Sequence, residues 1–317
     1  MKYSEAIREA QAQIMRSDES VFVCGLGVPD PKGVFGSTVG LEEEFGSKRV
    51  FDTPACENAT VGMMIGASFQ GMRPVMVNQR VDFTLLALDQ IINHAAKWKW
   101  MFGGVQRVPI VIRVIVGRGW GQGAQHSQTM HALFAHIPGL TVIMPSDSSA
   151  ILSAYPHVIN HLEAPVISFE HRLLYELDFT IDRQQIAAIS NPLTSRLKRT
   201  GSDVTVVATS IMVLEAERAA EHLATAGIEC DVIDLNCISN PDTAMIISSV
   251  EKTGRLLIAD TSWQAYGVAA EICRIICEQA PSALQAPVVT MGMSPAPCPT
   301  AKTLEDLYYP DLHDLCD

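Results

Sequence analysis

The chain has 317 residues, which is more than one hydrophobic core usually spans, so we expect two domains. Hydrophobic residues make up 48% of the chain and charged residues 18%, which is typical of an ordered globular protein and argues against disorder. The formal net charge of -12 disfavours nucleic acid and anionic membranes as partners, and plain solubility explains this charge best.

In the first part of the chain, helical and strand-like stretches alternate. Helical spacing or a buried helical run is found at residues 3–15, 58–70, 84–101 and 148–161. Short apolar runs typical of strands are found at residues 21–24, 50–53, 73–78, 108–116, 140–144 and 165–170. Strands that are separated by helices indicate a parallel sheet covered on both faces.

Residues 177–201 are polar and mixed, and they include the basic run 196–199, which favours a linker. The alternation then restarts, with strands expected at 204–209, 229–235 and 255–259 and helices at 213–226, 242–253 and 268–280. The predicted fold class is therefore α/β, with an N-terminal domain at 1–186, a linker at 187–200 and a smaller α/β domain at 201–317.

The eight cysteines include no CxxC pair and mostly lie in apolar runs, so neither a zinc site nor a disulfide framework is predicted. No metal ligand is assigned to this chain. Residues 1–17 are charged and amphipathic without an apolar signal core, and no stretch reaches transmembrane length. A cytoplasmic location is the resulting expectation.

The segment Asp52-Thr53-Pro54-Ala55-Cys56-Glu57 joins a predicted strand to a predicted buried helix. Pro54 stiffens the turn, and Glu57 opens a helix that is otherwise apolar. A carboxylate in this position either caps the helix N-terminus or projects into a site, and the residues alone favour neither reading.

The second segment, Asn78-Gln79-Arg80-Val81-Asp82-Phe83, begins at the carboxyl end of the strand predicted at 73–78. In an open parallel sheet, ligands bind at the carboxyl ends of the strands, so this polar group suits the rim of a pocket. The alternative is an ordinary solvated loop in which Asp82 caps the next helix.

The third segment, residues 117–128, contains four glycines and ends in Gln125-His126-Ser127-Gln128. It matches neither the phosphate loop with Gly-Lys-Ser/Thr nor the dinucleotide-binding spacing, so the glycines alone are weak evidence. His126 is either a satisfied polar histidine or a proton carrier beside a ligand, because imidazole titrates near neutral pH. A fourth segment, 294–302, contains three prolines and favours a rigid surface crossover, with a subunit contact nearby as one reading.

Taken together, these segments resemble the beta subunit of the decarboxylating component of 2-oxoacid dehydrogenase complexes, as found in pyruvate, branched-chain 2-oxoacid and acetoin dehydrogenases. The resemblance is carried by Thr-Pro-x-x-Glu at 53–57, Gly-Met-Arg-Pro at 71–74, Leu-Asp-Gln-Ile-Ile-Asn-His-Ala-Ala-Lys at 88–97, Gly-Ala-Gln-His-Ser-Gln at 123–128 and Phe-Ala-His-Ile-Pro-Gly-Leu at 134–140. Residues 201–207 and 252–260 extend it into the second domain, so that it covers nearly the whole chain.

The resemblance implies two transketolase-like domains, of which the first binds the pyrimidine ring of thiamine diphosphate and the second builds a dimer interface. Glu57 matches the glutamate that hydrogen-bonds the pyrimidine ring nitrogen, and this proton sharing lets the exocyclic nitrogen deprotonate the thiazolium carbon. Phe83 matches the aromatic residue beside the ring, and His126 matches the histidine that handles protons of the substrate. Gln79 matches a position beside the cofactor and the substrate. The expected substrate pocket consists of Ala55, Asn78, Gln79, Arg80, Gln125 and His126.

Thiamine enzymes bind the diphosphate and Mg²⁺ through a Gly-Asp-Gly segment followed by an Asn, and this chain contains no Gly-Asp-Gly. The resemblance therefore implies an alpha-type subunit that supplies the diphosphate half and holds the Mg²⁺, most simply in an α2β2 heterotetramer. For a dehydrogenase, it also implies a lipoyl acyltransferase as a further partner. A structural K⁺ near residues 142–147 is a further implication of the family.

Several positions depart from the family pattern. Asn78 and Arg80 are polar where the family has acidic and then bulky apolar residues, Ala55 is small, and Arg118 and Trp120 enlarge the glycine-rich loop. We expect a 2-oxoacid dehydrogenase of the pyruvate dehydrogenase type. The alternative is a two-component, transketolase-like carboligase that transfers the carbonyl unit to an aldehyde. A non-catalytic scaffold subunit is a third hypothesis, which requires that the site residues have decayed.

Overall fold

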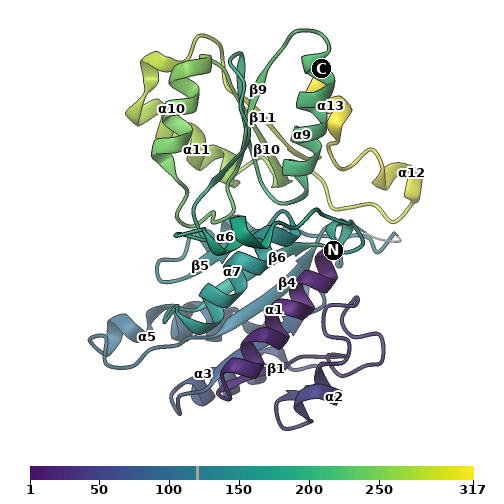
Figure 1. Ribbon diagram of the computed structural model, residues 1–317, viewed down its shortest axis with the longest axis vertical. Coiled ribbons are helices and arrows are strands. Elements are labelled where there is room, and N and C mark those ends of the chain that lie inside the picture. Colours follow the sequence, from purple (N-terminus) through teal and green to yellow (C-terminus); the bar gives the residue numbers. More distant parts are fainter. Residues whose placement is uncertain (119–120) are drawn as a thin grey trace. The chain divides into compact units, whose positions relative to one another are not determined.

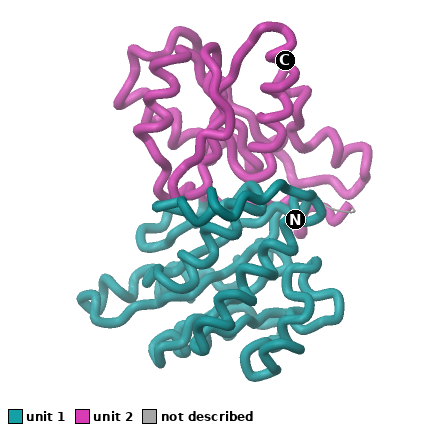
Figure 2. Tube along the Cα trace, in the orientation of Figure 1, with its two compact units in different colours: residues 1–116, 133–192 teal, residues 117–132, 193–317 magenta. Residues whose placement is uncertain are grey.

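The computed structural model describes residues 1–118 and 121–317, which divide into two compact units (Figure 2). Unit 1 comprises residues 1–116 and 133–192, and unit 2 comprises residues 117–132 and 193–317. The segment 117–132, which carries Gln125 and His126, thus belongs with the C-terminal half of the chain.

Unit 1 is built on a sheet whose described strands are all parallel and follow the order β2-β1-β3-β4-β6-β5 (Figure 1). The strands are β1 (Val21–Cys24), β2 (Val50–Phe51), β3 (Arg73–Asn78), β4 (Val111–Val116), β5 (Thr141–Ile143) and β6 (Val166–His171). Strands β4 and β6 are buried over their whole lengths, as expected for central strands with helices on both faces.

The helices of unit 1 include α1, which lies beside α7 in Figure 1. They are α1 (Tyr3–Ser17), α2 (Leu41–Phe45), α3 (Glu57–Ser68), α4 (Val81–Thr84), η1 (Leu85–Ala87), η2 (Asp89–Ala95), α5 (Ala96–Met101), α7 (Ser148–Asn160), η3 (Arg172–Leu174) and α8 (Arg183–Ala187). Helix α6 (His131–Ala135) begins in unit 2 and ends in unit 1. In place of the single helix predicted at 84–101, the structure has a succession of α, 3₁₀ and π turns, which are α4, η1, η2 and α5.

A charged pair lies in the core of unit 1, where Arg113 on β4 and Glu170 on β6 are both inaccessible to solvent. The Arg113 guanidinium donates to both Glu170 oxygens, at 2.7 and 2.8 Å, and to Gln11 Oε1 at 3.1 Å. The hydroxyls of Tyr155 and Tyr175 also donate to the Glu170 carboxylate. Buried charges are tolerated when they are paired and hydrogen-bonded in this way.

Unit 2 is built on a mixed sheet whose described strands follow the order β11-β10-β8-β9-β7. The strands are β7 (Arg196–Arg199), β8 (Val204–Ala208), β9 (Cys230–Asp234), β10 (Leu256–Trp263) and β11 (Val289–Met293). The helices are α9 (Ile211–Ala224), α10 (Thr243–Thr253), α11 (Val268–Gln279), η4 (Pro281–Ala283), α12 (Lys302–Glu305) and α13 (Leu312–Cys316). Strand β7 is antiparallel to β9, and the other pairs are parallel.

The predicted α/β fold class is confirmed in both units. The edge strands β7 and β11 are elements that the sequence patterns did not predict, and β7 forms within the segment expected to be a linker. The domain limits 1–186, 187–200 and 201–317 stay a prediction.

Candidate functional site

Three loops of unit 1 meet where the adjacent strands β2, β1 and β3 end. Asp52 Oδ1, after β2, accepts hydrogen bonds from the backbone amides of Gly27 at 3.0 Å and Thr53 at 2.8 Å. Gln79, after β3, donates to the Leu26 carbonyl at 3.0 Å. The carboxyl edge of the sheet, where ligands bind in open parallel sheets, is therefore braced by its own loops.

Gly25 allows the first of these loops to leave β1. A Cβ atom built on Gly25 would lie 2.3 Å from the Val77 carbonyl oxygen, and the φ angle is 149°. Any side chain there would collide with β3, so this close approach requires glycine.

Glu57 is the first residue of α3 and lies at this edge, half-buried. The preceding Cys56 makes no side-chain cap on the helix. Within the part of the chain that the structure describes, the Glu57 carboxylate has no hydrogen bond or ion pair. It is therefore available to a ligand.

The other expected site residues of unit 1 differ in how accessible they are. Ala55 is exposed, while Gln79 and Phe83 are half-buried. Asn78 is only 5% exposed and donates to Thr84 Oγ1 at 2.6 Å, and Arg80 is 2% exposed at the N-cap position of α4. Asn78 and Arg80 thus lie inside the protein in this chain, and their place in a substrate pocket stays a prediction.

The remaining two expected residues lie on the loop of unit 2. Gln125 is exposed, and His126 is half-buried with its backbone amide donating to the Gly123 carbonyl at 3.3 Å. Gly119 and Trp120, which belong to the predicted glycine-rich segment, lie outside the described residues. The joining of Gln125 and His126 with Glu57 in one site stays a prediction.

Among the residues that the structure describes, no group of three or more His, Cys, Asp or Glu side chains is placed to hold a metal ion. Asp147, at the end of the segment expected to bind K⁺, accepts a hydrogen bond from the Ala150 amide at 2.7 Å and caps α7. In the same described range, no helix combines the length and the apolar character needed to cross a membrane.

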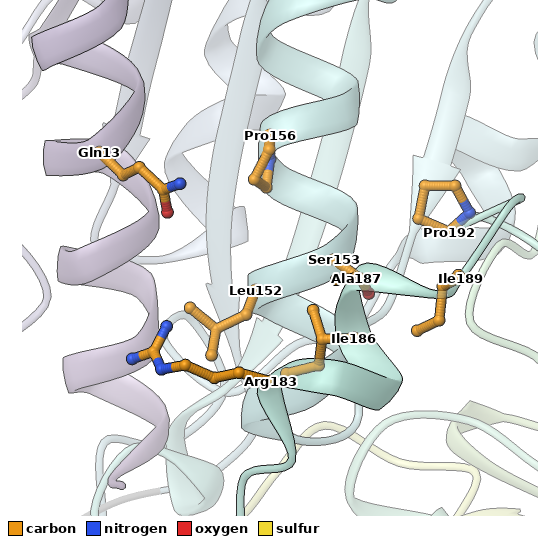
Figure 3. A pocket seen from close by; sticks show the side chains of 9 residues that line it. All are labelled: Gln13, Leu152, Ser153, Pro156, Arg183, Ile186, Ala187, Ile189 and Pro192. Atoms are coloured by element: carbon orange, nitrogen blue, oxygen red, sulfur yellow. The ribbon is translucent and has the colours of Figure 1, made fainter.

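A cavity of about 280 Å³ lies on a different part of unit 1 (Figure 3). Its lining residues come from α1, α7, α8 and the chain that follows α8: Gln13, Leu152, Ser153, Pro156, Arg183, Ile186, Ala187, Ile189 and Pro192. Arg183 is held by Glu9 at 2.7 Å. None of the expected cofactor or substrate residues lines this cavity, so it is a groove between helices and not the candidate site.

Two family models match the chain. Residues 1–177 match the transketolase pyrimidine-binding domain, and residues 194–315 match the transketolase C-terminal domain. Together these matches account for most of the chain.

Several relatives match over nearly the whole length of the chain. The pyruvate dehydrogenase E1 component subunit beta of Rhizobium meliloti (strain 1021) is 38% identical, covering 100% of this chain and 68% of that protein. The protein of the same name from Rickettsia felis is also 38% identical, over 99% of this chain and 95% of its own length. The beta subunit of acetoin:2,6-dichlorophenolindophenol oxidoreductase from Cupriavidus necator is 39% identical, over 96% and 92%.

Among solved structures, a split gene transketolase described as an inactive beta4 tetramer superimposes with a TM-score of 0.81. The superposition covers 100% of this chain and 96% of that one, at 19% sequence identity. It shows that the two chains share a fold.

Proposed function

Because this chain belongs to the family of E1 beta subunits with transketolase-type domains, we propose that it is the beta subunit of a two-component, thiamine-diphosphate-dependent 2-oxoacid dehydrogenase. The predicted family and the two transketolase-like domains are confirmed. The roles of individual residues and the make-up of the assembly are part of the proposal.

The observation that carries the proposal is the position of the Glu57 carboxylate and its lack of a partner in the described chain. Its carboxylate stands in the first turn of α3, at the carboxyl edge of the sheet, without a partner in the described chain. Such a carboxylate fits a ring nitrogen of a pyrimidine, to which it can donate or from which it can accept a shared proton. Phe83, half-buried in α4, supplies an apolar surface on which an aromatic ring can pack.

When bound, thiamine diphosphate supplies an electron sink for cleavage next to the carbonyl group of a 2-oxoacid. Glu57 would share a proton with the pyrimidine ring and so set its tautomer. Gln79, which is tied to the Leu26 carbonyl, keeps the first loop in place beside that position. His126 is the group that we assign to proton transfer with the substrate, because imidazole exchanges protons near neutral pH.

The chain supplies half of such a site. It contains no Gly-Asp-Gly segment, so we assign the diphosphate and Mg²⁺ to an alpha-type subunit. The assembly that follows most simply is an α2β2 heterotetramer, which would pass the acyl group to a lipoyl acyltransferase. A structural K⁺ near residues 142–147 remains part of the proposal.

Helix α3 supports the existence of a partner. Its exposed face carries Ala59, Met63 and Gly66, of which Met63 is 47% exposed. An apolar helix face that its own chain leaves uncovered is typical of a surface that another subunit covers. Since Glu57 begins this same helix, the covering subunit would stand next to the cofactor position.

The carboligase alternative rests on a pocket made polar by Asn78 and Arg80 and widened by Ala55, beside a loop enlarged by Arg118 and Trp120. The Asn78 and Arg80 side chains are buried within unit 1, so these two residues give this alternative no specific support. The dehydrogenase is therefore the preferred function.

Co-expression with an alpha-type subunit tests the proposal. The purified complex should reduce 2,6-dichlorophenolindophenol when it receives a 2-oxoacid, thiamine diphosphate and Mg²⁺, and either subunit alone should not. Pyruvate and branched-chain 2-oxoacids should be compared first. A complex that transfers two-carbon units from ketoses to aldehydes, and leaves every 2-oxoacid untouched, would contradict the proposal in favour of the carboligase.

A further inference from the structure

The loop that carries Gln125 and His126 is hydrogen-bonded to the rest of unit 2 through Ser127, Thr129 and His131. Tyr309 donates from its hydroxyl to the Ser127 carbonyl at 3.2 Å, and Ser262 Oγ donates to the Thr129 carbonyl at 2.7 Å. His131 Nε2 lies 2.9 Å from Asp260 Oδ2. Ser127, Thr129 and His131 are all buried, whereas Gln125 is exposed and His126 half-buried.

Asp260 is itself fixed at the end of the sheet, on β10. Its Oδ1 accepts from Thr209 Oγ1 at 2.6 Å and from the Thr261 amide at 2.8 Å. Burial alone would raise the pKa of Asp260, but His131 and the hydrogen bonds from Thr209 and Thr261 hold it below the usual range. The carboxylate therefore stays charged and offers His131 a fixed acceptor.

The beginning of the loop also packs closely against unit 2, through two glycines. Gly121 and Gly123 have φ angles of 63° and 71° and pack against Thr300. A Cβ atom on Gly121 would lie 2.4 Å from the Thr300 carbonyl oxygen, and one on Gly123 would lie 2.5 Å from Thr300 Oγ1. The backbone on both sides of His126 is thus fixed by residues between 260 and 309.

We propose that three positioning residues hold His126 in place for catalysis. They are Asp260, Ser262 and Tyr309, which we call the loop anchor. The inference rests on the proposed function, because it gives His126 the proton-transfer role. The C-terminal unit then has a part in the reaction in addition to any part in subunit contacts. Displacement of a catalytic group by as little as one ångström lowers turnover strongly, so the anchor should be visible in kinetics.

Two neighbouring tyrosines allow a matched test. Tyr309→Phe removes the bond to the loop together with a weaker one to Cys298 Sγ at 3.6 Å. Tyr308→Phe removes a bond to the Ala296 carbonyl at 2.8 Å and one from Trp263 at 3.0 Å, neither of which involves the loop. Ser262→Ala removes the second anchoring bond without disturbing the buried charge at Asp260. Thermal unfolding of each full-length variant shows whether it is folded.

The first measurement does not depend on enzyme activity. The rate at which diethyl pyrocarbonate modifies His126, followed by peptide mass spectrometry, should rise about fivefold in Tyr309→Phe and in Ser262→Ala, as expected from the loss of one hydrogen bond. The rate in Tyr308→Phe should equal that of the wild type. Equal rates in all four proteins would overturn the inference.

The second measurement is turnover in the complex with the alpha-type subunit. Tyr309→Phe and Ser262→Ala should lower kcat about tenfold with little change in KM for the 2-oxoacid, and Tyr308→Phe should not. A faster modification of His126 with unchanged kcat would also overturn the positioning role. His126→Ala separates the two proposals: full turnover in that variant removes the catalytic role of His126, while the modification rates still report whether the anchor holds the loop.

Discussion

Glu57 shows what a single side chain contributes at the residue scale. Its carboxylate is placed by a loop that Asp52 braces, and it is left without a partner in the described chain. The sequence motif singles out this residue, and the geometry shows a carboxylate without a partner in the described chain, while its role toward a ligand stays a proposal. Asn78, the last residue of β3, and Arg80 are buried, and the Asn78 amide donates to Thr84, so their place in a substrate pocket also stays a prediction.

Replacement of Glu57 by Gln should abolish most turnover of the assembled complex. The amide keeps the size of the side chain but cannot share a proton in the same way, and loss of such a group typically costs a factor of about 10² to 10⁴. Steady-state rates with saturating cofactor measure the effect. Glu43→Gln, which changes an exposed glutamate in the first turn of α2, is the matched control and should retain full activity. Equal rates in both variants would favour a non-catalytic scaffold.

The buried pair of Arg113 and Glu170 belongs to the same scale. Arg113→Met should lower the free energy of unfolding by about 3–5 kcal/mol, because it removes the charged partner of Glu170 in the core. Urea unfolding of the full chain measures the loss. The double variant Arg113→Met/Glu170→Met should be more stable than the single one, and a less stable double variant would contradict this account.

At the scale of elements, the central strands were predictable and the edge strands were not. β4 and β6 are buried on both faces and are rich in apolar residues apart from the paired Arg113 and Glu170 and the polar residues of β6, and such runs are visible in the sequence. β7 reads Arg-Leu-Lys-Arg, β11 contains Gly292, and both strands are mostly half-buried, so neither gives a clear pattern. Charged edge strands are expected, since they discourage pairing with other chains. The anchor pair His131 and Asp260 is 129 residues apart in sequence, and no local pattern could have joined them.

Helix α3 gives a prediction at this scale. Among the described residues beyond the helix's own backbone, no atom lies within 4 Å of a Cβ atom built on Gly66, so Gly66→Leu should fit the isolated chain and strengthen the helix by about 0.8 kcal/mol. The same leucine should weaken assembly with the alpha-type subunit at least tenfold, if that subunit packs closely on the exposed face.

Native mass spectrometry of mixed subunits reports the assembly, and urea unfolding reports the stability of the chain. Glu221→Leu adds a leucine to an exposed position of α9 in unit 2 and serves as the control. If Gly66→Leu assembles as well as this control, α3 is not the contact surface.

At the scale of the whole molecule, the chain is one part of an enzyme. The sequence already indicates this, because a pyrimidine-binding domain is present while Gly-Asp-Gly is absent. The isolated chain should therefore bind thiamine diphosphate only weakly, with a Kd in the millimolar range, and EDTA should not change that value. Titration calorimetry measures the Kd for thiamine diphosphate of the chain alone and of the complex. Tight, Mg²⁺-dependent binding by the chain alone would contradict the division of the site between subunits.

The exposed face of α3 has a consequence for the living cell. A copy of this chain that is made before its partner displays Met63 and the small residues around it to every other protein nearby. Synthesis of the two subunits in unequal amounts would then leave orphan copies that aggregate or are degraded. We therefore expect both subunits to be synthesised at the same time and in equal amounts. Assembly should follow soon after each chain folds.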